Sequence, residues 1–275
     1  MSTRPPLIAI HTWRGESKHY DNLATAMRGS SRIVSIPPPA QDADTLPRRV
    51  EGWVEHGESA LRALSVEPPY RFVGWSFGGV VAVELARRLG AGGADVEFVG
   101  MIDTIRPRLL PLSNQEFVWY HLGAAAAIPD PSERIAYLRQ KSMFLAYRRF
   151  PRMGSVAMAV LTRLGFRRGR PVKHSVRPTD PMQISIHASY LNYRADPVLF
   201  PVSLYATAES LKRGHEPVLR WLPWLHGGYE LAEIPGEHFT LFEPGHVEVL
   251  ADAIAASLQR VDTRRHRDPV HSPRD

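Results

Sequence analysis

Residues 73–79 read Val-Gly-Trp-Ser-Phe-Gly-Gly and join two stretches of different character. Residues 70–75 are the short apolar run of a buried strand, and residues 78–89 have the apolar spacing of a helix. Small residues on either side of a serine permit a tight strand-to-helix turn, in the pattern Gly-x-Ser-x-Gly. We therefore predict that Ser76 is a nucleophile exposed at the carboxyl edge of a sheet, where the helix N-terminus stabilises negative charge. The alternative is a structural glycine turn with an incidental serine.

Strands and helices alternate through the first hundred residues. The strands are expected at 7–10, 32–36, 70–75 and 96–102, and the helices at 20–27, 45–64 and 78–89. This alternation is typical of a parallel sheet with helices on its faces. The predicted fold class is therefore α/β, with a mostly parallel, doubly wound sheet.

The pattern changes after residue 106. Helix-start signals at Ser113–Glu116 and Asp130–Pro131, with helical stretches at 153–164 and 181–193, predict a helical lid insertion over about 106–196. The sheet resumes at 202–206 and 229–234, and residues 246–258 have the spacing of a final amphipathic helix. We expect a single domain over residues 1–262 and a disordered basic tail over 263–275.

Composition excludes several chemistries. The 275 residues contain no cysteine, which removes disulfides, a thiolate nucleophile and zinc sites with Cys ligands. The apolar run Leu7–Ile10 is too short for a signal peptide or a membrane span, so a cytoplasmic location is expected. The formal charge of +6 is concentrated in residues 163–173 and in the tail. This charge is either a docking face for an acidic partner or a solvated surface, and no nucleic-acid-binding motif accompanies it.

A serine hydroxyl needs a base, held in its working tautomer by a carboxylate. Of the twelve histidines, His238 lies in a tight loop that follows a strand and precedes the last helix. That is where the base lies in an α/β-hydrolase fold. His246 is placed at the start of the final helix, where capping is its expected role. For the acid there are two candidates, Asp103 and Glu209, which both follow strands and precede His238, so chain order leaves the choice open.

The sequence resembles the thioesterase domains of nonribosomal peptide and polyketide synthases over most of residues 5–260. The shared motifs are Gly74-Trp75-Ser76-Phe77-Gly78-Gly79, Glu84-Leu85-Ala86, Ile102-Asp103-Thr104 and Gly236-Glu237-His238-Phe239-Thr240-Leu241. The resemblance implies that Asp103 is the acid, because the family's aspartate commonly lies at the Ile-Asp-Thr position. Many other α/β-hydrolases, and the stand-alone editing thioesterases, place the acid near Glu209.

The oxyanion hole is expected to use the backbone N–H of Phe77 and one from the loop after the first strand. Alignment with the family assigns the second donor to Trp13, with Tyr20 at the family's tyrosine position. The family's loop reads approximately His-Pro-x-Gly-Gly, whereas Thr12 and Arg14 here replace a proline and a glycine. The loop is therefore expected to differ in shape or to present Trp13 and Arg14 to the substrate.

The resemblance implies a thioesterase that releases an acyl, peptidyl or polyketide chain from a phosphopantetheinyl carrier protein in secondary-metabolite biosynthesis. A Ser76 acyl-enzyme would be resolved by hydrolysis or by cyclisation, with no metal or cofactor of its own. Since the fold uses nearly the whole chain, the carrier protein is expected to act in trans, and the basic insertion is a candidate docking surface. Two alternatives remain open: a carboxylesterase or lipase acting on oxygen esters, and a noncatalytic α/β-hydrolase relative that binds a ligand or partner.

Overall fold

The computed structural model describes residues 4–10, 18–27, 29–40, 45–106, 180–212 and 220–267, together with 122, 125, 131–132, 134–135, 138–139 and 142. The chain divides into two compact units, one of Met1–Arg108 with Asp180–Asp275 and one of Leu109–Thr179. The first unit contains the sheet. In the second unit the described residues are helical.

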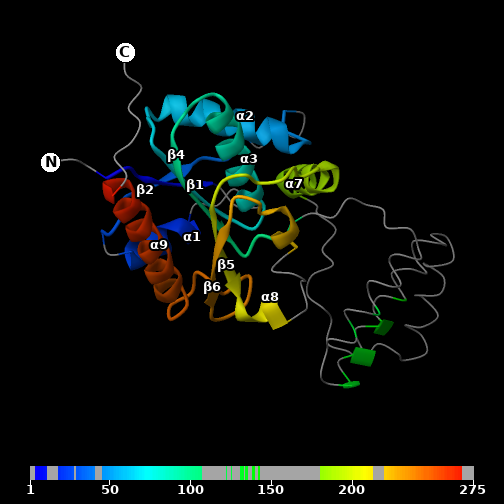
Figure 1. Ribbon diagram of the computed structural model, residues 1–275. Coiled ribbons are helices and arrows are strands. Elements are labelled where there is room, and N and C mark those ends of the chain that lie inside the picture. The colour runs from blue at the N-terminus through cyan, green and yellow to red at the C-terminus, as the bar shows by residue number, and fades with distance from the viewer. Residues whose placement is uncertain are drawn as a thin grey trace, which may run out of the picture. The chain divides into compact units, whose positions relative to one another are not determined.

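Six strands of the described residues pair in parallel in the order β2-β1-β3-β4-β5-β6. They are β1 (Leu7–Ile10), β2 (Ile33–Ile36), β3 (Tyr70–Trp75), β4 (Val96–Ile102), β5 (Val202–Thr207) and β6 (Tyr229–Ile234). The strand order reverses between β1 and β3, so the connections cover both faces of the sheet (Figure 1). In such sheets ligands bind outside the carboxyl ends of the strands at the reversal. The predicted doubly wound α/β fold is confirmed.

The helices of the sheet unit divide between its two faces (Figure 1). Helices α1 (Lys18–Ala26) and α9 (Val247–Arg267) pack on one face, and α2 (Val50–Ala63) and α3 (Phe77–Ala91) on the other. The remaining elements are α7 (Pro181–Asn192), the short helix α8 (Ala208–Lys212) and a 3₁₀ turn, η1 (Leu222–Trp224). Alternate residues of each central strand serve the two faces, since side chains alternate along a strand.

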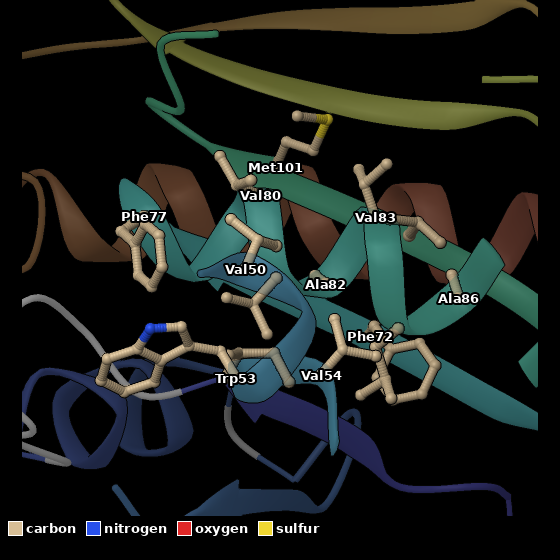
Figure 2. Packing of buried hydrophobic residues seen from close by; sticks show 14 of the residues in the cluster. Val50, Trp53, Val54, Phe72, Phe77, Val80, Ala82, Val83, Ala86 and Met101 are labelled. Carbon is tan, nitrogen blue, oxygen red and sulfur yellow. The ribbon is translucent and has the colours of Figure 1, made fainter. Parts of the chain in front are cut away.

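The core beside α2 and α3 is built on large, fully buried side chains (Figure 2). Trp53 of α2 meets Phe77 of α3 edge to face, with ring centroids 5.5 Å apart, and its Nε1 donates to Ser189 Oγ at 2.9 Å. Phe72 of β3 is also fully buried in this cluster. Each such side chain contributes about 1.5–3 kcal/mol through removal from water. This packing fixes the start of α3, and therefore the turn that carries Ser76.

The final helix extends further than predicted. Arg71 of β3, which is 3% exposed, donates to Glu97 of β4 and to Asp262 of α9, and Arg265 also pairs with Glu97. Asp262 and Arg265 lie on either side of residue 263, where the disordered tail was predicted to begin. The prediction of a disordered tail from residue 263 was therefore wrong as far as Arg267, and residues 268–275 lie outside the described residues. Composition suggested disorder because the carboxylate partners are distant in sequence.

The insertion is also shorter than the predicted 106–196. Helix α7 belongs to the sheet unit, because Ser189 accepts from Trp53 and Tyr193 donates to Glu84 Oε1 of α3 at 2.6 Å. Met182 and Ile186 of α7 are buried in the core that α2 and α3 share. The second unit therefore spans Leu109–Thr179.

Replacement of Gly74 by alanine should destabilise the turn severely. A Cβ at residue 74 would lie 2.1 Å from the backbone oxygen of Gly78, which cannot move without displacing the start of α3. We expect Gly74→Ala to lower the free energy of unfolding by about 3 kcal/mol or more in urea titrations. Gly90→Ala is the matched control, since a Cβ there meets open space and should stabilise α3 by about 0.5–1 kcal/mol. Equal stabilities for the two variants would contradict this account of the turn.

Candidate active site

Ser76 lies on the turn between β3 and α3, at the reversal in strand order. Its backbone has φ 55° and ψ −119°, a conformation that non-glycine residues rarely adopt. The Ser76 N–H donates to the Ile102 carbonyl oxygen at 2.9 Å, and the Ser76 carbonyl accepts from the Gly79 N–H at 3.1 Å. A Cβ at Gly79 would lie 2.0 Å from Thr104 Oγ1. The glycines therefore allow the turn to approach the end of β4 while the serine side chain stays partly exposed.

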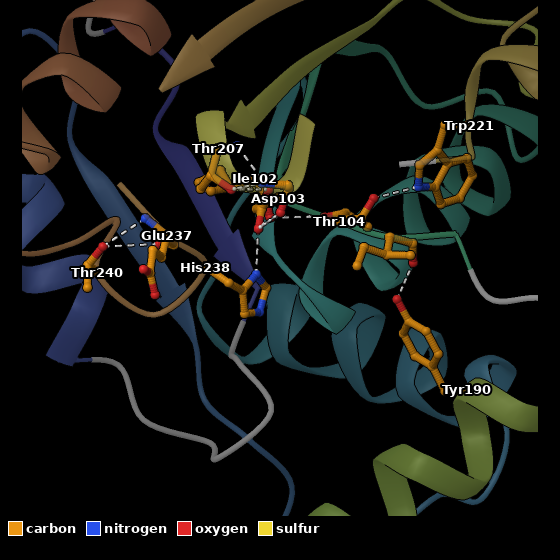
Figure 3. A network of polar contacts seen from close by, with 11 residues as sticks. Ile102, Asp103, Thr104, Tyr190, Thr207, Trp221, Glu237, His238 and Thr240 are labelled. Atoms are coloured by element: carbon orange, nitrogen blue, oxygen red, sulfur yellow. Dashed lines mark hydrogen bonds and ion pairs between the residues drawn. The ribbon is translucent and has the colours of Figure 1, made fainter. Parts of the chain in front are cut away.

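Asp103 follows β4 and is fully buried, with its carboxylate surrounded by donors (Figure 3). Oδ1 accepts from the backbone N–H of Thr207 at 3.0 Å and from its hydroxyl at 3.2 Å. Oδ2 accepts from Ser210 Oγ at 3.0 Å and lies 2.6 Å from His238 Nδ1. Buried carboxylates are tolerated only when they are paired and hydrogen-bonded in this way.

The Asp103 carboxyl remains ionised at neutral pH. Burial raises its pKa, but the hydrogen bond and charge of His238 lower it, as do the Thr207 N–H and the Ser210 hydroxyl. The net effect is a pKa below the ordinary value. A carboxylate at this position can hold the Nδ1 proton of the histidine and stabilise the imidazolium when it forms.

His238 lies in the loop after β6, and its side chain is 26% exposed. Because Nδ1 faces Asp103, Nε2 is the nitrogen that can exchange a proton with a hydroxyl. The imidazole ring lies beside Trp75, with centroids 5.2 Å apart, so it is next to the residue that precedes Ser76. The loop is held by the Glu237 N–H, which donates to Thr240 Oγ1 at 2.9 Å (Figure 3).

The two acid candidates have different surroundings. Asp103 contacts His238, whereas Glu209 lies in the first turn of α8. Thr207 and Ser210, on either side of Glu209, donate to the Asp103 carboxylate. Residues at and just after the end of β5, where many other hydrolases have their acid, therefore donate hydrogen bonds to the Asp103 carboxylate in this protein. His246 precedes α9 as expected, and its Nδ1 lies 2.9 Å from the Thr240 carbonyl oxygen beneath the histidine loop.

The expected oxyanion donors are described only in part. Phe77 is the first residue of α3, and the first N–H groups of a helix have no partner within the helix. The Phe77 side chain is packed in the core, so any role of this residue in binding must come from its backbone N–H. Trp13 and the rest of the loop 11–17 lie outside the described residues.

Tyr20 of α1 links the first strand to the serine turn, a role that sequence reasoning missed. Its buried hydroxyl donates to the Ile10 carbonyl oxygen at 2.8 Å and accepts from the Trp75 N–H at 3.0 Å. Burial raises the pKa of Tyr20, opposed by the Trp75 hydrogen bond, so the hydroxyl stays protonated. The match to the family's tyrosine position was the one sequence feature that pointed to Tyr20. Its partners are backbone groups at the ends of β1 and β3, and a sequence pattern does not show such contacts.

A parallel sheet with a serine on the turn after β3, and a histidine–aspartate pair beside that turn, is the arrangement of the α/β-hydrolase class. Such an arrangement can support attack of a hydroxyl on an acyl carbonyl, with the proton passing to the imidazole.

Comparison with known proteins shows which of them this chain is similar to. A family model described as "Thioesterase domain" matches residues 5–115. Inactive atromentin synthetase invA4 of Paxillus involutus is 22% identical over 263 residues, which cover 93% of this chain and 27% of that protein. Enterobactin synthase component F of Escherichia coli strain K12 is 24% identical over 260 residues, covering 93% of this chain and 18% of that protein.

A solved thioesterase domain has a similar fold. The NocB thioesterase domain, in covalent complex with a fluorophosphonate nocardicin G analog, matches with a TM-score of 0.55 and 22% identity, covering 94% of this chain and 96% of that chain. The chain is therefore similar to thioesterase domains, as the sequence resemblance predicted. This chain spans less than a third of the length of the two curated relatives.

No helix in the described part of the chain is long and apolar enough to cross a membrane. Within the same residues, no three His, Asp or Glu side chains are grouped so as to hold a metal ion.

Asp103→Asn should lower stability in a pH-dependent way. Because the folded pKa of Asp103 lies below the ordinary value of 3.8, its contribution is complete above that pH and is lost as the pH falls through the folded value. We expect the variant to be about 1–3 kcal/mol less stable at pH 7. Urea titrations from pH 7 to pH 3 should show this difference shrinking below about pH 4. Asp252→Asn, at an exposed position of α9, controls for the loss of a carboxylate.

Tyr20→Phe should destabilise the fold and reduce turnover. The change leaves the Ile10 carbonyl and the Trp75 N–H buried without their partner, at a cost of about 2 kcal/mol or more. Thermal unfolding and kcat on one ester substrate measure the two effects. Tyr229→Phe is the control, since Tyr229 is 47% exposed on β6. Unchanged stability and kcat in Tyr20→Phe would rule out the link between β1 and the serine turn.

Proposed function

We propose that this chain is a serine-dependent thioesterase that releases an acyl, peptidyl or polyketide chain from the phosphopantetheine arm of a carrier protein or domain. The observation that carries the proposal is the 2.6 Å contact between His238 Nδ1 and the buried Asp103 carboxylate, beside the turn that bears Ser76. A buried carboxylate costs stability unless it is paired, and a strained serine turn also costs stability. Their combination at one sheet edge is characteristic of a site selected for catalysis.

In the proposed mechanism His238 Nε2 accepts the Ser76 hydroxyl proton as Oγ attacks the thioester carbonyl carbon. Negative charge on the carbonyl oxygen is stabilised by the Phe77 N–H and by a second donor, assigned to Trp13 by resemblance. The C–S bond then breaks, and the thiolate takes the proton from His238. Water, or an amine or hydroxyl of the acyl chain, next gives its proton to His238 and attacks the ester carbon. The bond between that carbon and Ser76 Oγ then breaks, and Oγ takes the proton back from His238, which completes hydrolysis or cyclisation.

The related proteins support this proposal in two respects. The NocB domain is described in covalent complex with a fluorophosphonate, a reagent that phosphonylates activated serines. Enterobactin synthase component F is a synthase component rather than a free esterase, which favours a carrier-bound substrate. The proposed partner is a carrier, which can be a separate protein or a domain of the same polypeptide. The basic stretch around Arg167 and Arg168, the candidate docking surface, lies outside the described residues.

Intact-mass analysis with acylated carrier proteins tests the mechanism. We expect His238→Ala to retain an acyl adduct on Ser76, because attack can occur slowly while deacylation lacks its base. Ser76→Ala should form no adduct, and both variants should lose about 10³-fold or more in kcat. His226→Ala and Ser59→Ala are the matched controls, since both residues are outside the site.

Comparison of a carrier thioester and an oxygen ester of the same acyl group tests the substrate class. A thioesterase should show the higher kcat/KM on the carrier thioester. A preference for the free oxygen ester would replace the proposal with a carboxylesterase, and a Ser76 that a fluorophosphonate probe does not label would indicate a noncatalytic binding protein.

A further inference from the structure

Arg106 is a buried cation near the end of β4. It lies three residues after Asp103 and is 8% exposed. Within the part of the chain that the structure describes, its buried Nε has no hydrogen-bond partner. Burial of an unpaired guanidinium is costly, so its retention calls for a compensating anion.

The guanidinium is held in a fixed orientation. It lies over the Trp224 ring, with its central carbon 3.8 Å from the ring centroid. Stacking of this kind uses the flat face of the guanidinium and leaves its N–H edge for a planar or tetrahedral anion. Such an edge binds carboxylates and phosphates through two parallel hydrogen bonds.

The backbone before Arg106 is fixed by two aromatic donors (Figure 3). Trp221 Nε1 donates to the Thr104 carbonyl oxygen at 2.8 Å, and the Tyr190 hydroxyl of α7 donates to the Ile105 carbonyl oxygen. Both donors are neutral, so they satisfy the backbone without neutralising the arginine. The segment is therefore held in place before any ligand arrives, which lowers the entropic cost of binding.

A second positive charge lies nearby. Burial lowers the pKa of Arg106, with the charge of Arg220 adding to the decrease and Tyr193 opposing it. Arg220 precedes Trp221 and has φ 69°, in the left-handed region. Arg220 therefore does not neutralise the charge of Arg106.

This region adjoins the candidate active site. Tyr190, which holds the Ile105 carbonyl, packs against Phe77 with ring centroids 5.8 Å apart. Phe77 follows Ser76 and supplies the expected oxyanion donor. Burial raises the pKa of Tyr190, and the charges of Arg220 and Asp103 act on that pKa in opposite directions.

We propose that Arg106, stacked on Trp224, binds an anionic group of the substrate beside the Ser76 turn. That group is the phosphate of the phosphopantetheine arm or a carboxylate of the acyl chain. The inference rests on the proposed function, because it names the substrate feature that the same site recognises. Arg106 is a binding residue in this proposal and takes no part in proton transfer.

Four thioesters distinguish the two sources. One pair carries the same neutral acyl group on pantetheine or on phosphopantetheine, and the other carries a neutral or an ω-carboxylated acyl group on pantetheine. Arg106→Gln should lower kcat/KM about tenfold or more on the anionic member of one pair, mainly through KM, and spare the neutral member. Arg106→Lys should restore part of the loss, since it keeps the charge without the bidentate edge. Arg264→Gln, at an exposed position of α9, is the control.

Equal losses on all four thioesters would show that Arg106 only packs against Trp224, and would overturn the inference. If Arg106→Gln does not fold, the wild-type protein still provides a test. Equal inhibition by pantetheine and phosphopantetheine, together with equal kcat/KM for the neutral and carboxylated acyl groups, would also overturn it.

Binding to a Ser76→Ala variant separates this inference from the proposed function. Trp224 lies under the guanidinium, so tryptophan fluorescence should report occupation of the site. Tighter binding of phosphopantetheine than pantetheine, or of adipate than its monoamide, that disappears with Arg106→Gln would support an anion site even if the wild-type protein turned over no thioester. Turnover by the wild type without any anion preference would leave the thioesterase proposal standing and remove the anion site.

Discussion

The buried carboxylate of Asp103 is the constraint on which the rest of the site depends. A charge at a fully buried position requires donors on every side, and these come from three separate parts of the chain: the end of β5, the helix α8 and the loop after β6. The Asp103 N–H also donates to the Tyr205 carbonyl at 2.7 Å, which joins the ends of β4 and β5. The Asp103 carboxylate therefore has all its hydrogen bonds only when β4, β5, α8 and the loop after β6 are assembled at the carboxyl edge of the sheet.

The serine turn is set by a different requirement, close approach of backbones. Its glycines let α3 begin directly against β3 and the Thr104 side chain. The strain at Ser76 is opposed by the packing of Phe77 against Trp53 and by the hydrogen bond from the Trp75 N–H to the Tyr20 hydroxyl. The packing of the core and the geometry of the candidate site therefore depend on each other, and a substitution in the core beside α3 should alter the position of Ser76.

Local sequence patterns predicted much of this arrangement. Alternating strands and helices, and the glycines around Ser76, indicated the sheet and the turn because both depend on neighbours in sequence. His238 was found from its place between a strand and the last helix. The choice of Asp103 over Glu209 could not come from chain order, since it depends on which strand end faces the imidazole. Tyr20, Thr207 and Ser210 were missed as partners for the same reason, as were the ion pairs that extend α9 to Arg267.

The pairing of Arg71 with Asp262 has a consequence for synthesis of the protein on the ribosome. Arg71 lies in a central strand, yet one of its two counterions is 191 residues further along the chain. Until α9 has emerged, the charge of this central strand is only partly compensated, and α1 is the one helix of this face that has been synthesised. The sheet unit therefore cannot complete its packing before α9 is available.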